Sequence, residues 1–140
     1  MDASTLTPDY FNQLGRGSLV SHLGIEISAA GADALVAELT IGAQHLAPNG
    51  FLHAGTVVSL ADTACGYACI AKLPQGAHGF TTIELKSNHL GTAREGAIVA
   101  TAKAVHLGRT TQVWDAIVSN KETGKTIALF RCTQMILYPK

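Results

Sequence analysis

The longest apolar segment of the chain lies between His53 and Lys72, and Asp62 is its only charged side chain. The segment contains no proline and is rich in alanine, so a length of about five turns favours a helix over a strand. Because this helix is apolar on nearly every side, the rest of the chain must wrap around it. We therefore expect a long central helix over about residues 54–72.

Strand-like patterns flank the predicted helix on both sides. Before it, Ile25–Ser28 and Ala34–Ile41 predict a hairpin that turns at residues 31–33. After it come four longer β-type segments, Phe80–Leu90, Ala97–Leu107, Thr110–Asn120 and Thr126–Leu137. Their connections are short and rich in turn residues, which predicts an antiparallel meander.

The N-terminal part predicts two short helices. Thr7 as N-cap and Pro8 at the first helical position begin a helix that ends near Leu14. Residues 18–23 predict another helical turn, which ends at Gly24. The whole chain, residues 1–140, is thus expected to be a single α+β domain in which an antiparallel sheet of five to six strands wraps around the long helix.

Composition narrows the classes of partner. The chain has ten basic and ten acidic residues and no basic run, which argues against nucleic acid and against an anionic membrane as partners. Only 14% of residues are charged while 47% are hydrophobic, which favours an oligomer that hides part of the surface. The first thirteen residues lack the basic and apolar regions of a signal peptide, so we expect a cytoplasmic protein.

Two further features favour a soluble fold with reduced thiols. Leu52–Ala71 is long enough to cross a membrane, but its acid, its glycines and its many small polar residues favour a buried helix of a soluble protein. The odd set of Cys65, Cys69 and Cys132 predicts buried free thiols. The six histidines show no ligand spacing, so we expect no metal site.

Asp62 is the candidate functional residue that the pattern itself identifies. Burying an unpaired carboxylate costs several kcal/mol. An acid in the middle of an apolar helix therefore needs either neighbouring hydroxyl groups that satisfy it or a chemical function.

Three segments resemble one known family. HAGTVVSLADTACGYA, from His53, resembles the HGG-x5-A-[DE] signature of hotdog-fold acyl-CoA thioesterases of the phenylacetate-pathway (PaaI-like) type. TTIELKSNHLGTAREG and GKTIALFRCTQMIL are similar to the strand after the helix and to the last strand of that family. The resemblance covers residues 19–137 and implies the hotdog fold, with hydrolysis of an aryl or short- to medium-chain acyl-CoA to a free acid and coenzyme A. It also implies a dimer of dimers and no cofactor other than the coenzyme A of the substrate.

The resemblance implies roles for the motif residues. His53 matches the motif histidine and is expected to orient the helix start, with a catalytic base as the alternative, and Asp62 matches the catalytic carboxylate. Ala54 stands where the family has a glycine whose N–H helps to hold the thioester oxygen. Many members have Asn or Gln where this chain has Ala47, and Asn49 is the nearby candidate to replace it.

Other residues follow from the same resemblance. Thr82 matches a position near the attacking water, and Leu90–Gly96 matches the turn that borders the coenzyme A site. Apart from the resemblance, the candidates for substrate binding are Asn88 and His89 for the acyl pocket, Arg94 and Arg109 in predicted turns for the coenzyme A phosphates, and Gly66. The alternative for the two arginines and for the Asn-His pair is an ordinary solvated surface position.

The residues also permit the chemistry on physical grounds. The first helical turn presents the unpaired N–H groups of Ala54 and Gly55, and one such oxyanion donor is worth about 100–1000-fold in rate. Asp62 is expected to act as a general base on water or as a nucleophile, and the sequence leaves both open. Asp62 lies eight residues beyond Ala54, about 12 Å along a helix, so one carbonyl group cannot contact both in one chain. We therefore predict a dimer with two sites between antiparallel helices.

Two other functions fit the same residues. A hotdog dehydratase acting on carrier-protein substrates also pairs a histidine with a helix carboxylate, although His53 ahead of Asp62 on one helix fits the thioesterase pattern better. A non-catalytic acyl-CoA binding module is consistent with Ala47, which lacks a water-positioning group.

Overall fold

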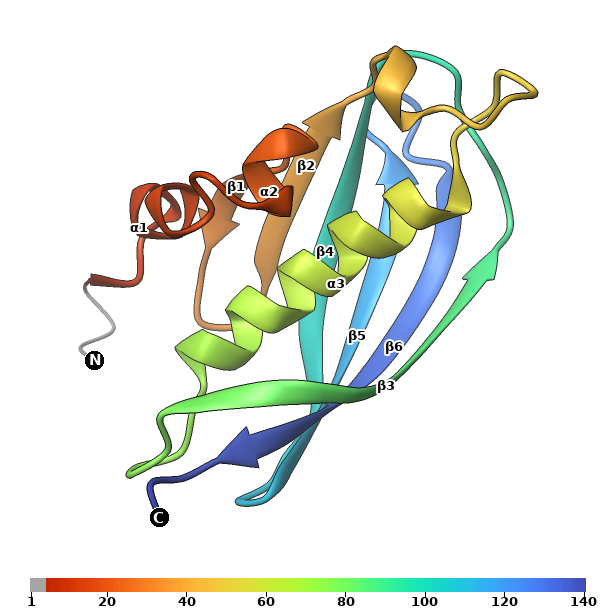
Figure 1. The fold of residues 1–140 in the computed structure, drawn as a ribbon. Coiled ribbons are helices and arrows are strands. Elements are labelled where there is room, and N and C mark those ends of the chain that lie inside the picture. Colours follow the sequence, from red (N-terminus) through yellow and green to blue (C-terminus); the bar gives the residue numbers. More distant parts are fainter. Residues whose placement is uncertain (1–4) are drawn as a thin grey trace.

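A computed structural model describes residues 5–140 (Figure 1). Its helices are α1 (Pro8–Leu14), α2 (Leu19–His22), the short 3-10 helix η2 (Ala43–His45) and α3 (Ala54–Ala71). Its strands are β1 (Glu26–Ala30), β2 (Leu35–Thr40), β3 (Gly79–His89), β4 (Ala97–Leu107), β5 (Thr111–Asn120) and β6 (Thr126–Leu137). The expected absence of a signal peptide concerns in part residues 1–4, which lie outside the described residues.

Both N-terminal helices begin as their sequences predict. The Thr7 side chain accepts a hydrogen bond from the Tyr10 N–H at 3.2 Å, and the Ser18 side chain accepts one from the Val20 N–H at 3.2 Å. α1 packs on α3 through the fully buried Phe11, whose ring stacks on the ring of Tyr67 in α3. The helix-start signals are therefore confirmed.

The six strands form one antiparallel sheet in the order β1-β2-β4-β5-β6-β3 (Figure 1). The hairpin of β1 and β2 is confirmed, and so is the meander from β4 to β6. The meander is wrong for β3, which pairs with β6 and not with β4. β3 and β4 are three strand spacings apart, about 14 Å, which residues 90–96 can cross. A short, turn-rich connection is thus compatible with a crossover as well as with a hairpin.

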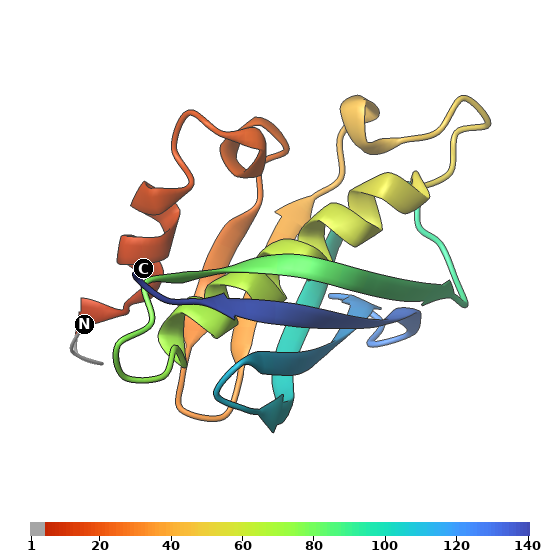
Figure 2. The same ribbon diagram turned by 60° about the horizontal axis from the view of Figure 1, so that its bottom comes forward.

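α3 lies across one face of the curved sheet, as Figure 2 shows from a second direction. The helix ends one residue earlier than expected. Its small residues allow close approach: a Cβ added to Gly66 would lie 3.1 Å from the ring of Phe80 on β3. By length and composition α3 passes as a membrane span, but half of it is buried in the fold. The predicted hotdog architecture, a sheet around a long apolar helix, is confirmed.

β3 leaves one edge of the sheet open. It stands last in the strand order, so one side of its backbone has no partner strand among residues 5–140. Leu85 on β3 pairs with the buried Cys132 of β6 and points to the side of α3, yet it is 42% exposed. The helix of the same chain therefore does not cover this half of β3. A free edge of eleven residues with apolar side chains favours pairing with another strand.

Candidate active site

His53 caps the start of α3. Its backbone is extended, with φ −68° and ψ 135°, and its Nδ1 accepts a hydrogen bond from the Gly55 N–H at 2.7 Å. Because Nδ1 is an acceptor in this contact, the proton of the neutral imidazole is on Nε2. The structure thus gives His53 an orienting role at the helix start.

This hydrogen bond also makes a difference between the amides of Ala54 and Gly55, which the sequence predicts as oxyanion donors. The Gly55 N–H is bonded to His53 Nδ1, and the Thr56 N–H is bonded to the carbonyl oxygen of His53 at 3.0 Å. The Ala54 N–H has no hydrogen-bond partner within residues 5–140. It lies at the positive end of the helix macrodipole, which makes it the amide available to an incoming carbonyl oxygen.

His45, a buried histidine for which the sequence predicts no role, holds this helix start in place. The carbonyl oxygen of His45 accepts hydrogen bonds from the His53 N–H at 3.0 Å and from the Thr56 hydroxyl at 2.9 Å. The His45 ring is 1% exposed; it accepts from the Gly42 N–H at 2.8 Å and donates through Nε2 to the carbonyl of Leu23 at 2.6 Å. No sequence signal marked this role, because the bonds of His45 to Thr56 and to Leu23 span 11 and 22 residues of chain.

The turn before α3 contains the departure from the family pattern. The Ala47 carbonyl accepts from the Gly50 N–H at 2.8 Å, and the Ala47 N–H donates to the Phe51 carbonyl at 2.7 Å. The Asn49 side-chain oxygen accepts from the Phe51 N–H at 3.1 Å. Because that oxygen is bonded, the exposed side-chain nitrogen of Asn49 is the group left to replace the one that Ala47 lacks.

Asp62 is an unsatisfied acid. Its Oδ1 is buried and has no hydrogen-bond partner within the described part of the chain. Ser59, a hydroxyl on the preceding turn, donates instead to the Gly55 carbonyl at 2.8 Å. Burial raises the pKa of the Asp62 carboxyl above its ordinary value. A half-buried acid with a buried, unpaired oxygen is typical of a functional site, and the alternative of capping by a hydroxyl finds no bond among the described residues.

Thr82 points to the same side of the sheet as a buried glutamine. Its hydroxyl donates to Gln134 Oε1 at 2.7 Å, and the Gln134 side-chain nitrogen lies 3.5 Å from Cys132 Sγ. Gln134 is fully buried. The hydroxyl proton of Thr82 is therefore engaged in this hydrogen bond, whereas the hydroxyl oxygen can still accept one. A glutamine within a strand gave no signal in the sequence.

The two arginine candidates lie at different ends of the molecule. The Arg94 guanidinium carbon is 4.1 Å from the centroid of the Phe51 ring, two residues before His53. Arg109 lies over Tyr138 at 5.3 Å, in the turn between β4 and β5. That turn adjoins the C-terminal end of α3, where Lys72 accepts from a glutamine of β5. Within one chain, only Arg94 is next to the helix start.

The remaining candidates for substrate binding are also separated. Asn88 lies on the face of the sheet away from α3, where it lines a shallow hollow. His89 pairs with the buried Ala128 and so points to the opposite face. Gly66 is buried against Phe80. The structure thus does not bring the Asn-His pair together on one side of the sheet.

The three cysteines are buried and free, as predicted. A hydrogen bond with Cys132, together with burial, raises the pKa of Cys65, and burial raises the pKa of Cys69 to about 12. These thiols therefore stay protonated and are poor nucleophiles. No cluster of three His, Cys, Asp or Glu residues suited to a metal ion occurs within residues 5–140.

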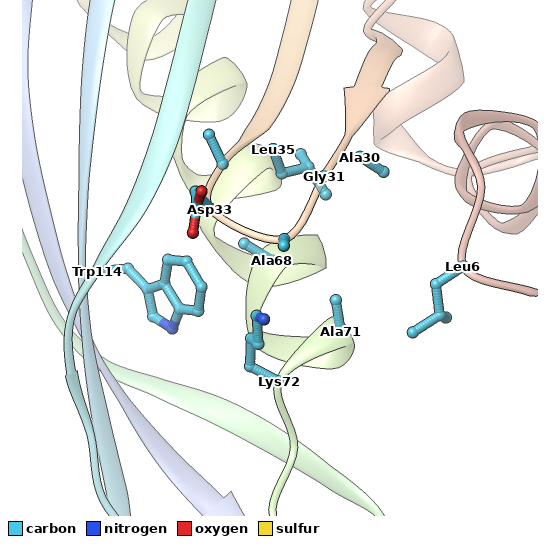
Figure 3. A pocket seen from close by; sticks show the side chains of 11 residues that line it. Leu6, Ala30, Gly31, Asp33, Leu35, Ala68, Ala71, Lys72 and Trp114 are labelled. Atoms are coloured by element: carbon cyan, nitrogen blue, oxygen red, sulfur yellow. The ribbon is translucent and has the colours of Figure 1, made fainter. Parts of the chain in front are cut away.

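A separate cavity of about 230 Å³ lies beyond the C-terminal half of α3 (Figure 3). Ala68, Ala71 and Lys72 form one side of it, and Trp114 forms another. None of the residues predicted for catalysis or substrate binding lines this cavity.

Comparison with known proteins places the chain in a family. Residues 49–127 match the model of the thioesterase superfamily. A crystal structure of a thioesterase from Haemophilus influenzae has a TM-score of 0.89 and 36% identity, covering 94% of this chain and 91% of that one. The E. coli PaaI protein of the phenylacetic acid degradation operon has a TM-score of 0.79 and 31% identity, covering 90% and 88%.

A relative of named activity is similarly close. The 1,4-dihydroxy-2-naphthoyl-CoA hydrolase of E. coli is 32% identical over 135 residues, which are 94% of this chain and 96% of that one. The chain therefore belongs to the thioesterase superfamily, and it is a hotdog-fold thioester hydrolase.

Proposed function

We propose that this protein hydrolyses an acyl-CoA thioester to a free carboxylic acid and coenzyme A. The observation that carries the proposal is the buried, unpartnered carboxylate oxygen of Asp62 on the helix whose first amide, at Ala54, is also unpartnered. The first group suits attack at the thioester carbon and the second suits the developing oxyanion. Relatives that are named as thioesterases and as a CoA hydrolase support the same chemistry.

The two groups divide the reaction between them. The Ala54 N–H donates to the carbonyl oxygen as it gains negative charge. Asp62 either takes a proton from water, which then adds to the carbon, or adds to the carbon itself and forms an anhydride that water opens. In both routes the C–S bond breaks, the thiolate of coenzyme A leaves and takes up a proton, and the acid keeps one oxygen from water. Because its pKa is raised, the Asp62 carboxylate binds a proton more tightly than an ordinary aspartate does, which suits a general base.

The active site needs two chains. Ala54 and Asp62 are about 12 Å apart along α3, whereas both must reach one carbonyl group. Antiparallel packing of two α3 helices would place Ala54 of each chain near Asp62 of the other. The open edge of β3, with the exposed Leu85 beside it, offers the pairing surface for such a dimer.

The acyl group is proposed to be aromatic. The E. coli relative is named for a naphthoyl thioester and the PaaI structure for phenylacetic acid degradation. Arg94, held over Phe51 beside the helix start, is the proposed contact for the phosphates of coenzyme A. The reaction as proposed requires only water and the coenzyme A of the substrate.

Mixing two inactive variants tests the shared site. Asp62→Asn leaves Ala54 intact, and Ala54→Pro leaves Asp62 intact, so each homodimer lacks one group at both sites. A mixed dimer restores one complete site, and random pairing of equal amounts restores about one quarter of the wild-type rate. Thiol release from a panel of acyl-CoAs, after co-expression of the two variants, measures the recovery.

The outcomes separate the alternatives. No recovery on mixing would contradict the two-chain site. A wild-type protein that binds acyl-CoA but releases no thiol from any member of the panel would instead support a non-catalytic binding module.

A further inference from the structure

The cavity of about 230 Å³ beyond the C-terminal half of α3 lies on the side of the helix opposite the proposed catalytic acid (Figure 3). Ala71, which lines the cavity, follows Asp62 by nine residues, or about two and a half helical turns. The two side chains therefore leave α3 in opposite directions, about 13 Å apart along the helix axis. The cavity is thus separate from the site in which Asp62 is proposed to act.

The interior of the cavity is apolar and lined by small side chains. Leu35 of β2 and Ala68 of α3 are buried, and Ala30 and Ala71 are half-buried beside them. The ring of Trp114 on β5 forms a wall. Because a cavity of about 150 Å³ already holds benzene, this one has room for a ring or a branched chain with a short polar end.

Hydrogen bonds hold the walls of the cavity in place. Trp114 Nε1 donates to Gln112 Oε1 at 2.8 Å, and Gln112 Nε2 donates to the carbonyl of Lys72 at 2.8 Å. Gln112 is fully buried, so it fixes the indole ring to the end of α3. On the other side, the Gly31 N–H donates to the Ala34 carbonyl at 3.0 Å and closes the turn between β1 and β2. The cavity is therefore preformed, which lowers the cost of ordering a ligand in it.

Two opposite charges line the same cavity. Asp33 lies in the turn between β1 and β2, and Lys72 caps the end of α3. Figure 3 shows the Lys72 side chain between Trp114 and Ala71. Neither the Asp33 carboxylate nor the Lys72 ammonium group forms an ion pair within residues 5–140. A molecule that enters the cavity therefore meets one unpaired carboxylate and one unpaired ammonium group.

We propose that this cavity binds a small zwitterion with an apolar body, of the class of the free α-amino acids with apolar side chains. The carboxylate of the ligand pairs with Lys72, and its ammonium group pairs with Asp33. Its side chain fills the space beside Leu35, Ala68 and Trp114. A ligand with only one charge leaves the other protein charge unpaired beside its apolar body, so the cavity prefers the zwitterion. The inference does not rest on the proposed function, because none of the groups proposed for hydrolysis lines the cavity.

The fluorescence of Trp114 measures binding to this cavity, because Trp114 is the single tryptophan of the chain. We expect L-phenylalanine, with excitation at a wavelength that the ligand does not absorb, to change the emission in a saturable manner with a Kd at or below about 1 mM. 3-Phenylpropanoate lacks the ammonium group and 2-phenylethylamine lacks the carboxylate, while both keep the ring. Each should bind at least about 5-fold more weakly than L-phenylalanine. Calorimetric titration of the full chain gives a second measure of the same affinities.

Two charge variants assign the two ends of the ligand. Asp33→Asn should bind L-phenylalanine no more tightly than 3-phenylpropanoate, because the ammonium group has lost its partner. Lys72→Met, which keeps the apolar stem, should bind L-phenylalanine no more tightly than 2-phenylethylamine. Both positions are exposed, so neither change should unfold the protein. Lys125→Met is the matched control, because Lys125 is an exposed lysine outside the cavity, and it should bind all three ligands as wild type does.

Two further variants locate the ligand. Ala71→Leu should fill the cavity and abolish the fluorescence change, with thermal melting by circular dichroism as the check that the variant is folded. Asp62→Asn should keep the wild-type affinity, since Asp62 lies on the other side of α3.

Four outcomes would overturn the inference. They are a wild type without a saturable response, a singly charged ligand that binds as tightly as L-phenylalanine, a folded Ala71→Leu that still binds, and a loss of binding in Asp62→Asn. Thiol release from acyl-CoA is measured separately, so each of these results leaves the proposed function standing.

Discussion

The Nδ1 atom of His53 accepts the N–H of Gly55 at 2.7 Å, and this bond decides which amide of the helix start is free. If the His53 ring did not accept this bond, the N–H groups of both Ala54 and Gly55 would be free to donate. With the bond made, His53 orients the first turn and the Ala54 amide alone remains available. The roles of the motif residues can therefore be tested separately.

Ala54→Pro should remove the proposed oxyanion donor without breaking α3. Proline lacks the N–H but is favoured at the first helical position, and the extended backbone of His53 already suits the residue before a proline. We expect kcat to fall about 100–1000-fold in a thiol-release assay. Ala54→Gly, which keeps the amide, should stay within a few-fold of wild type. A proline variant with the wild-type kcat would assign the oxyanion to another donor.

Asp62→Asn should lower kcat at least about 100-fold with the oligomer intact, because the amide neither accepts a proton nor attacks the carbonyl. In wild type, kcat/KM should rise with pH as the carboxyl loses its proton. Since burial raises the pKa of Asp62, this rise should occur at higher pH than for an ordinary aspartate. A flat profile for wild type across that range would remove Asp62 from the chemistry.

The same substitution should increase stability at neutral pH. A folded-state pKa above the unfolded value means that the folded state binds the proton more tightly, so unfolding free energy falls as pH rises from the unfolded pKa through the folded one. Asp62→Asn has no carboxyl group to ionise at this position, so its unfolding free energy does not fall in this way. Its melting temperature should exceed that of wild type at pH 7, and the difference should shrink as pH is lowered toward the unfolded pKa. A lower melting temperature for the variant at pH 7 would mean that the assembled protein stabilises the ionised acid.

His45→Ala should weaken both the fold and the active site. It leaves the part-buried Gly42 N–H and Leu23 carbonyl without their His45 partners, at up to about 1–3 kcal/mol for each group. We expect urea unfolding to report roughly 2–5 kcal/mol of lost stability. Because the His45 carbonyl also holds the start of α3, kcat should fall more than KM changes. His22→Ala, at a surface histidine, is the control that should leave both quantities unchanged.

Arg94→Met should raise KM for acyl-CoA several-fold and leave kcat near wild type, because a phosphate contact far from the carbonyl contributes to binding only. Phe51→Leu should cause a smaller rise in KM, since it removes the ring under the guanidinium at 4.1 Å. An acyl-pantetheine thioester, which lacks the nucleotide, should show neither effect. Equal losses with both substrates would point to a disturbed helix start.

The sequence predicts the elements and most of their neighbours, and β3 is the exception. The limits of the long helix and the strands agree with the structure to within two residues, because apolar periodicity and turn residues act locally. The place of β3 beside β6 was missed, since pairing depends on the curvature of the whole sheet. The sequence predicts Asn88 and His89 as a substrate-binding pair, but adjacent residues of a strand point to opposite faces.

The sequence by itself determined the central helix, the acid within it and the motif that gives the family. These depend on the order of residues along one chain, as does the 12 Å separation on which the proposed two-chain site rests. Only the tertiary structure decided that His53 occupies the Gly55 amide, that His45 holds the helix start, and that Thr82 is tied to Gln134. Such contacts join side chains to groups that the sheet brings together from distant parts of the chain. Hydrogen bonds and burial depend on distance in space, which the order of residues does not contain.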